Sequence, residues 1–257
     1  MGALETRLRA VRERGEKAFA PYVTGGFPGV DAALLRALAA AGADAIEVGI
    51  PHSDPIMDGG VVQEASRIAL EGGSHPRDVL ATIAEAAVDV PVAVMTYANI
   101  VTRPGLESFC DDAAAAGVAG LIVPDLPVDE AAELEALAAA RSMDLVLLAA
   151  PGTTPERYEA IGAAARGFVY CVATYGVTGA RDVLATTAQE VVAAMRAYTD
   201  RPLLVGVGIA TPAQATAACA FADGVVVGSA LMARLLAGDR AGLLELAAAF
   251  RSAVDEA

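Results

Sequence analysis

The stretch "AIEVGIPHSDPIMDGG" (residues 45–60) carries two carboxylates in places where the surrounding residues do not require charge. Glu47 lies inside the apolar run "AIEVGI", which is typical of a buried strand. Asp58 follows in a loop rich in proline and glycine. Because burying an unpaired charge is costly, a carboxylate in such a strand indicates a function beyond packing.

Short apolar runs alternate with Ala- and Leu-rich helical stretches along the chain. The runs predict strands over residues 18–23, 45–50, 92–97, 120–125, 145–150, 168–173, 203–208 and 224–229. Apolar residues at helical spacing predict helices that include 31–42, 106–117, 128–140 and 155–165. Such alternation favours a parallel sheet. Eight units in 257 residues predict an α/β fold, the (β/α)8 TIM barrel, as a single domain over residues 1–257.

Three further segments refine this prediction. The amphipathic residues 1–17 predict an extra N-terminal helix, and long loops are expected after the second and sixth strands. In a barrel these loops lie at the C-terminal face, where active sites are built. A doubly wound open sheet is the alternative, but no GxGxxG motif follows the first strand.

Composition narrows the classes of function. Apolar residues make up 55% of the chain, which is enough for a large core, and no run is long enough to span a bilayer. The net charge of −14 argues against binding of nucleic acid or anionic membranes. Three widely spaced cysteines form no metal or disulfide pattern, and the N-terminus lacks the features of a signal peptide. A reducing, cytoplasmic location is expected.

The two carboxylates of the opening stretch suit acid–base chemistry. If Ile46 and Val48 pack outward, Glu47 points into the barrel, where desolvation raises the pKa of its carboxyl. The alternative is a structural glutamate paired with an arginine. Asp58 could reach over the barrel mouth from its loop, or it could cap the helix that starts near Val61.

The last two predicted strands end in glycines before a helix begins, in "GVGIATP" (206–212) and "VGSALM" (227–232). Glycine allows a ligand to approach the backbone closely, and the N–H groups at a helix start bind anions. Gly208, Gly228 and Ser229 are therefore candidates for a phosphate site in the part of a barrel that usually holds one. Tight turns alone are the alternative.

The sequence lacks the residues that Schiff-base, metal-dependent and serine-nucleophile catalysis require. Lys17 is the only lysine and precedes the first strand, at the wrong end of a barrel for a Schiff base. His52 and His75 are scattered, so no metal site is predicted. No GxSxG motif is present. The remaining chemistry is catalysis by carboxylates on a phosphorylated substrate, without a cofactor.

Motifs over nearly the whole chain resemble the α subunit of tryptophan synthase. They are "PYVTGGFPG", "IEVGIPHSDPIMDG", "MTYANIV", "GLIVPDLPVDEA", "GFVYCVATYGVTGAR", "VGVGIATPAQA" and "DGVVVGSALM". The resemblance implies a lyase that cleaves indole-3-glycerol phosphate to indole and glyceraldehyde 3-phosphate by a retro-aldol reaction. It also implies an α2β2 complex for tryptophan biosynthesis. In that complex indole passes to a β subunit, and only the β subunit carries pyridoxal phosphate.

The resemblance also implies roles for single residues. Glu47 matches the family's proton-shuttling glutamate, and Asp58 matches the aspartate that accepts the indole N–H. Thr178 and Gly179 match the loop that closes over the substrate, where Thr178 would bond to Asp58 and Gly179 to the phosphate.

Three further groups follow from the same resemblance. The phosphate positions are Gly208, Gly228 and Ser229. The tyrosines near the glutamate are Tyr97 and Tyr170, and the alternative for both is a core aromatic, above all for Tyr97. The positions that face the β subunit are Asp54, Pro55 and Asn99.

Two alternative functions remain within the same family: a stand-alone lyase of a specialised pathway, and a non-catalytic subunit that activates a β partner. A sugar-phosphate isomerase on the same barrel would cleave no C–C bond.

Three positions depart from the family pattern. His52 replaces an aromatic residue before "SDP", Gly60 replaces the proline after "DG", and Phe27 stands in the usual "GDP" turn. Gly60 widens the conformations open to the Asp58 loop. The changes are expected to affect the partner contact more than the chemistry.

Overall fold

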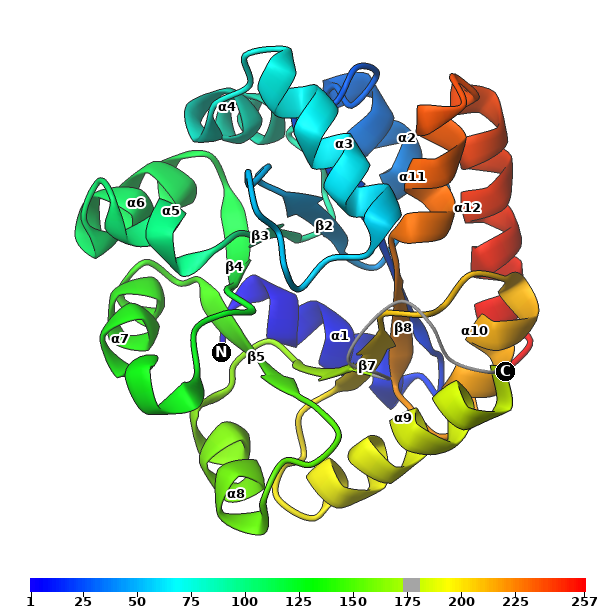
Figure 1. Cartoon of the computed structure of the whole chain (residues 1–257). Helices are drawn as coiled ribbons and strands as arrows, with labels where there is room; N and C mark the ends of the chain where they lie inside the picture. Colours follow the sequence, from blue (N-terminus) through cyan, green and yellow to red (C-terminus); the bar gives the residue numbers. More distant parts are fainter. Residues whose placement is uncertain (173–180) are drawn as a thin grey trace.

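The computed structural model of the chain describes residues 1–172 and 181–257. In this part, eight parallel strands close into a barrel in the order β1 to β8, and β1 pairs with both β2 and β8 (Figure 1). The strands are β1 (Ala18–Thr24), β2 (Ile46–Gly49), β3 (Val92–Met95), β4 (Val118–Ile122), β5 (Asp144–Ala149), β6 (Val169–Val172), β7 (Leu203–Gly206) and β8 (Gly224–Val227). The predicted barrel is confirmed, and each predicted strand overlaps an observed one.

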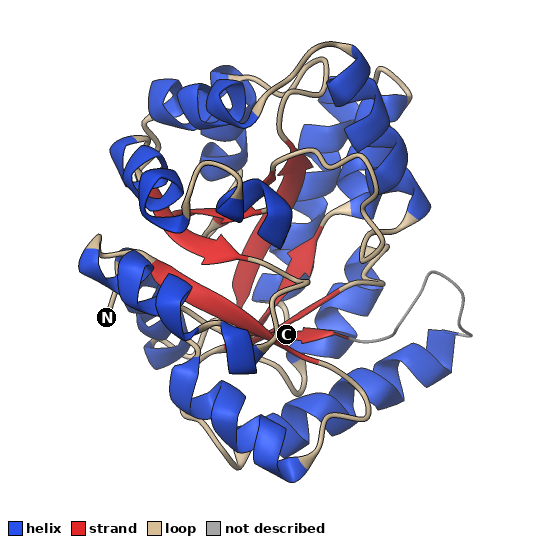
Figure 2. Cartoon of the chain, turned by 60° about the vertical axis from the view of Figure 1, so that its left-hand side comes forward, coloured by secondary structure: helices blue, strands red, loops and turns tan. Residues whose placement is uncertain are grey.

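Helices surround the strands on all sides (Figure 2). They are α1 (Ala3–Glu13), α2 (Ala32–Ala40), α3 (Gly60–Glu71), α4 (Pro76–Ala86), α5 (Ala98–Thr102), α6 (Leu106–Ala115), the 3₁₀ helix η1 (Val128–Glu130), α7 (Ala132–Ala140), α8 (Pro155–Ala164), α9 (Arg181–Arg196), α10 (Pro212–Cys219), α11 (Ser229–Leu236) and α12 (Arg240–Asp255). Within the two described ranges, none of these helices has the length and apolarity to span a membrane.

The predicted additions to the barrel are present where the chain is described. Helix α1 precedes β1, and residues 50–59 form a loop between β2 and the added helix α3. Another added helix, α11, follows β8 and is eight residues long. Of the predicted long loop after the sixth strand, residues 173–180 lie outside the described residues.

Several predicted elements are longer than the observed ones. Strand β7 ends at Gly206 because Val207 and Gly208 have φ values of 62° and 106°, which a strand cannot adopt. Strand β3 ends at Met95 because Tyr97 already serves as the N-cap of α5. The predicted helix over 128–140 is split into η1 and α7.

The strands are held between the barrel interior and the helices. Every residue of β1, β2 and β4 is buried, as expected for a parallel sheet covered on both faces. Helix starts are fixed by side chains that accept the N–H of the third helical residue and so satisfy one of the open donors of the first turn. These caps are Asp31, Thr154, Thr211 and Asp239.

Helix α1 closes the N-terminal end of the barrel. It lies across the middle of the strands in Figure 1 and buries Leu4, Leu8 and Val11. The carboxylate of Asp144, the first residue of β5, accepts the N–H groups of Gly2 and Glu5, each at 3.0 Å. A carboxylate at a helix N-terminus satisfies open donors and complements the helix dipole.

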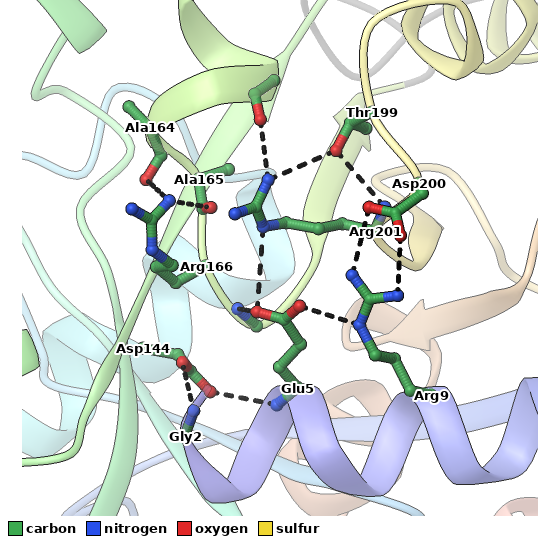
Figure 3. Close-up of polar contacts among 12 residues, drawn as sticks. Gly2, Glu5, Arg9, Asp144, Ala164, Ala165, Arg166, Thr199, Asp200 and Arg201 are labelled. Atoms are coloured by element: carbon green, nitrogen blue, oxygen red, sulfur yellow. Dashed lines mark hydrogen bonds and ion pairs between the residues drawn. The ribbon is translucent and has the colours of Figure 1, made fainter.

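Glu5 is a buried glutamate that two arginines neutralise (Figure 3). Its side chain lies below the barrel, and the residue is 4% exposed. Arg9 donates from Nε to Glu5 Oε1 at 2.8 Å, and Arg201 Nε lies 3.7 Å from Glu5 Oε2. The N–H of Gly167 donates to the same Oε2 at 3.3 Å, and Arg9 is also paired with Asp200. The network ties α1 to the segments before β6 and β7.

Lys17 lies at this same end of the barrel, directly before β1. Its Nζ donates to the carbonyl oxygen of Ala222 at 2.9 Å, and Ala222 lies just before β8. The only lysine of the chain is therefore far from the strand ends at which a barrel builds its active site. The prediction that it stands at the wrong end for a Schiff base is confirmed.

Glu5→Gln is expected to destabilise the fold. The change leaves the two arginines partly buried without their carboxylate, which should lower the free energy of unfolding by about 2–4 kcal/mol. Urea denaturation followed by circular dichroism measures it. The control is Glu64→Gln, which removes an exposed ion pair with Arg67 and should leave stability almost unchanged. Equal midpoints for the two variants would contradict the role assigned to Glu5.

Candidate active site

Glu47 is a buried carboxyl on β2, and among the described side chains no arginine forms an ion pair with it. It pairs in register with Tyr22 on β1 and Ala93 on β3, and it is 3% exposed. Its Oε2 has no hydrogen-bond partner among the described residues. Burial, and secondly the charge of Asp58, raises the pKa of Glu47 to about 8. At neutral pH the carboxyl is therefore mainly protonated, and it can both give and take a proton.

The interior around Glu47 is filled by a tyrosine that the sequence did not single out. Side chains alternate along a strand, so Glu47 and Gly49 share one face of β2. A Cβ on Gly49 would lie 2.2 Å from the hydroxyl oxygen of Tyr22. The Tyr22 hydroxyl lies 3.2 Å from Thr24 Oγ1. The signal that could have found Tyr22 is its position in "APYVTG", where a polar-tipped aromatic falls within a buried strand.

Tyr170 on β6 is accommodated in the same way. A Cβ on Gly206, in the neighbouring β7, would lie 2.2 Å from the Tyr170 hydroxyl oxygen. Burial raises the pKa of Tyr170 well above its usual value, and the charges of Glu47 and Asp58 add to the effect. The structure therefore places this predicted site residue within electrostatic reach of both carboxyls, and its hydroxyl stays protonated.

Asp58 is held by Tyr97 and does not cap α3. The Tyr97 hydroxyl donates to Asp58 Oδ2 at 3.2 Å and accepts the N–H of Met57 at 3.1 Å. The N-cap of α3 is Gly59, with no side-chain bond, so the predicted capping alternative is wrong. Burial raises the pKa of Asp58 to about 6, against the opposing effects of the Tyr97 bond and the neighbouring His52.

Tyr97 joins the loop to the barrel. It is 4% exposed, consistent with a core aromatic, yet its hydroxyl makes both bonds to the Asp58 loop. Two backbone contacts complete the support: the N–H of Asp58 donates to the Pro55 carbonyl at 3.0 Å, and Gln63 Nε2 donates to the Asp58 carbonyl at 2.9 Å. The carboxylate therefore sits on a loop with defined supports.

The predicted phosphate residues lie at the ends of β7 and β8. Gly208 has a φ of 106°, so the turn itself requires glycine there. Gly228 is the N-cap of α11 and Ser229 is its first residue. A Cβ on Gly228 would lie 3.0 Å from the Tyr22 ring. The first N–H groups of a helix have no partner within it, and α11 therefore offers donors beside the interior tyrosine.

The predicted partner-facing residues differ in exposure. Asp54 and Asn99 are exposed, whereas Pro55 is buried. The next two residues, Ile56 and Met57, are 71% and 41% exposed, and sequence reasoning did not single them out. Exposed apolar side chains grouped on one loop are typical of a contact surface.

The remaining predicted site residues and departures are placed as follows. Thr178 and Gly179 lie outside the described residues. Phe27 is 6% exposed and belongs to the core, so this departure affects packing. A Cβ on Gly60 would meet no atom within 4 Å, so nothing nearby requires glycine there. In the described ranges, no three His, Cys, Asp or Glu side chains are grouped so that they could hold a metal ion.

Comparison with known proteins connects this geometry to a family. The family model described as tryptophan synthase alpha chain matches residues 8–252. The chain is 44% identical to the tryptophan synthase alpha chain of Halorhodospira halophila over 259 aligned residues, covering 99% of this chain and 94% of the relative. Identity to the Synechocystis alpha chain is also 44%, over 243 residues, covering 93% of this chain and 92% of the relative.

Solved structures agree with the sequence matches. A crystal structure of tryptophan synthase from M. tuberculosis, in its aminoacrylate-bound form, superposes with a TM-score of 0.89 at 37% identity, covering 99% of this chain and 100% of that one. Another from the same organism, in space group F222, gives a TM-score of 0.91 at 40% identity, covering 99% and 98%. With matches that span nearly its whole length, this chain belongs to the tryptophan synthase alpha chain family.

Proposed function

We propose that this chain is a lyase that cleaves indole-3-glycerol phosphate to indole and glyceraldehyde 3-phosphate. The observation that carries the proposal is a pair of carboxyls, the buried Glu47 and the half-buried Asp58, whose pKa values are raised to about 8 and about 6. The charge of Asp58 contributes to the raised pKa of Glu47, so the two groups act on one site. At neutral pH one carboxyl holds a proton while the other is ionised.

The reaction begins with protonation of the indole ring. The Glu47 carboxyl gives its proton to indole C3, which turns the ring into an indolenine with positive charge at nitrogen. The Asp58 carboxylate accepts a hydrogen bond from the ring N–H and stabilises that charge. Because Asp58 is held by Tyr97, its carboxylate needs little reorganisation when the charge develops.

Bond cleavage returns the proton to the enzyme. The Glu47 carboxylate takes the proton from the hydroxyl on the carbon attached to C3. The electrons of that O–H bond form the new carbonyl, and the electrons of the C–C bond return to the indole ring. Glyceraldehyde 3-phosphate and indole result, and Glu47 is protonated again. A single carboxyl serves both steps because its pKa lies between those of a strong acid and a strong base.

The interior tyrosines keep this site dry and neutral. Burial raises the pKa values of Tyr22 and Tyr170 well above the usual value, so both hydroxyls remain uncharged donors. They occupy the space that Gly49 and Gly206 leave open. Excluding water strengthens the electrostatic effect of Asp58 on the reacting ring.

The substrate phosphate is bound by backbone N–H groups near Gly208, Gly228 and Ser229. The N-terminus of α11 supports this role, since helix starts bind anions through open donors. A net charge of −14 cannot steer a phosphate inward, so local geometry must do so. Thr178 and Gly179 would close over the bound phosphate.

A β subunit is the expected partner and would carry the pyridoxal phosphate, whereas this chain needs no cofactor for the cleavage. The exposed Asp54, Ile56, Met57 and Asn99 support docking beside the mouth of the barrel. Pro55 would shape that loop from beneath. The assembly would be α2β2, and the chain would act as one domain, which is supported by a single barrel formed from strands spread over residues 18–227.

Substitution of either carboxyl should abolish most activity. Glu47→Gln removes the transferable proton and should lower kcat by at least about a thousandfold. Asp58→Asn removes the charge that stabilises the indolenine and should lower kcat about a hundredfold or more. Indole release from indole-3-glycerol phosphate is measured with and without a β subunit, with Glu64→Gln as the control on the exposed face of α3.

The same assay separates the alternatives. Indole release that depends on the β subunit supports the proposal. Rapid release by the isolated chain would favour a stand-alone lyase. If the wild-type chain released no indole under either condition, the role would be that of a non-catalytic subunit.

The pH profile should be a bell with limbs near pH 6 and pH 8. Activity needs Asp58 ionised, so it falls as pH drops through about 6, and it needs Glu47 protonated, so it falls as pH rises through about 8. In Asp58→Asn the acid limb should disappear. The alkaline limb should also move to lower pH, because the charge that raises the pKa of Glu47 is gone. A residual activity with unchanged limbs would contradict this assignment.

A further inference from the structure

His52 contacts Tyr97, the residue whose hydroxyl holds Asp58. Its ring stacks on Tyr97, with ring centroids 4.4 Å apart and an interplanar angle of 23°. Tyr97 in turn donates its hydroxyl to Asp58. Any shift of the imidazole therefore changes the packing of the tyrosine that positions the carboxylate.

Both ring nitrogens of His52 have partners. The N–H of Asp54 donates to Nδ1 at 3.0 Å, and Nε2 lies 3.0 Å from Asn99 Oδ1. Because Nδ1 accepts a hydrogen bond, the proton of the neutral ring is assigned to Nε2, which donates to Asn99. The ring thus joins the loop 50–59 to helix α5.

An aromatic hydrocarbon at this position could provide only part of these contacts. A phenyl ring could stack on Tyr97, but it has no acceptor for the N–H of Asp54 and no donor for Asn99. Gly60, the first residue of α3, follows this loop. The two bonds of His52 therefore supply order at the N-terminal end of the loop, while Tyr97 and Gln63 hold the end that carries Asp58.

We propose that His52 is a positioning residue for the lyase reaction: its uncharged ring connects the exposed Asn99 to the Asp58 loop and fixes the carboxylate through Tyr97. The inference rests on the proposed function and deepens it, since Asn99 is a proposed partner-facing residue. A partner that moves Asn99 would act on the catalytic aspartate through two side chains.

The connection requires the uncharged ring. A proton on Nδ1 would remove the acceptor of the Asp54 N–H. Asp54 and Asp58 lie on the same loop as His52, and the Asp125 carboxylate accepts the N–H of Ala98 at 2.9 Å, next to Asn99. Because anionic neighbours favour a cation, the neutral ring is required by the hydrogen bond that Nδ1 accepts and not by these charges.

The tautomer can be measured without activity. The chain has two histidines, and His75 is exposed, so His75→Gln leaves a single ring to observe. Long-range ¹H–¹⁵N spectra of the full chain at alkaline pH should show the Nε2–H form, and Asn99→Ala should shift the Nε2 resonance. An Nδ1–H form, or a resonance that ignores Asn99→Ala, would overturn the proposal.

Three substitutions separate the contacts. His52→Phe keeps the stacking and loses both hydrogen bonds. His52→Asn places an oxygen near the position of Nδ1 and can still accept the Asp54 N–H. His52→Gln places its amide near the position of Nε2 and can still donate to Asn99. The His52→Phe variant should lower kcat about five- to tenfold at nearly constant KM, because each lost bond is a modest one. The other two should retain intermediate rates.

The link to Asn99 is tested by a double-mutant cycle in the assembled complex. His52→Phe and Asn99→Ala should together reduce kcat no more than the larger single effect, since both break the same connection. Effects that multiply, or an unchanged kcat in His52→Phe, would overturn the positioning role while the lyase reaction of the wild type stands. His75→Gln is the control and should behave as wild type. A wild-type complex that releases no indole would instead overturn the proposed function, and the positioning role with it.

Discussion

The C-terminal end of this barrel depends on one constraint, a buried carboxyl that no cation among the described residues neutralises. Two buried glutamates show the contrast. Glu5, below the barrel, lies among Arg9 and Arg201 and serves to anchor a helix. Glu47, inside the barrel, meets no such charge in the part of the chain that the structure describes, and its burial favours the protonated form. A glutamate is thus structural at one end of the barrel and able to exchange a proton at the other. The difference comes from the residues that surround each side chain.

Space inside the barrel is divided between tyrosines and glycines on adjacent strands. Tyr22 and Tyr170 reach into the interior only because Gly49 and Gly206 have no side chains. The uncharged hydroxyls lie within electrostatic reach of Glu47 and supply no positive charge that would lower its pKa. The packing of the core and the acidity of the site therefore depend on the same pairs of residues.

The barrel could be predicted from the sequence because eight apolar runs alternate with helical stretches, and both carboxylates stood out as charges in unusual surroundings. Strand ends were less predictable, since the positive φ of Val207 depends on the turn that follows β7. Tyr22 was overlooked because an aromatic residue in a strand looks the same in sequence whether its hydroxyl meets a site or a core. Burial of Pro55 depends on how its loop folds back, which local composition does not encode.

The position of Lys17 has a practical consequence for handling the molecule. The chain has one lysine, bonded to Ala222 at the closed end of the barrel, and helix α1 covers that end. Amine-directed coupling to a resin or a dye would therefore attach through one pole of the molecule. The opposite pole, with its loops and carboxyls, would face outward in a uniform orientation.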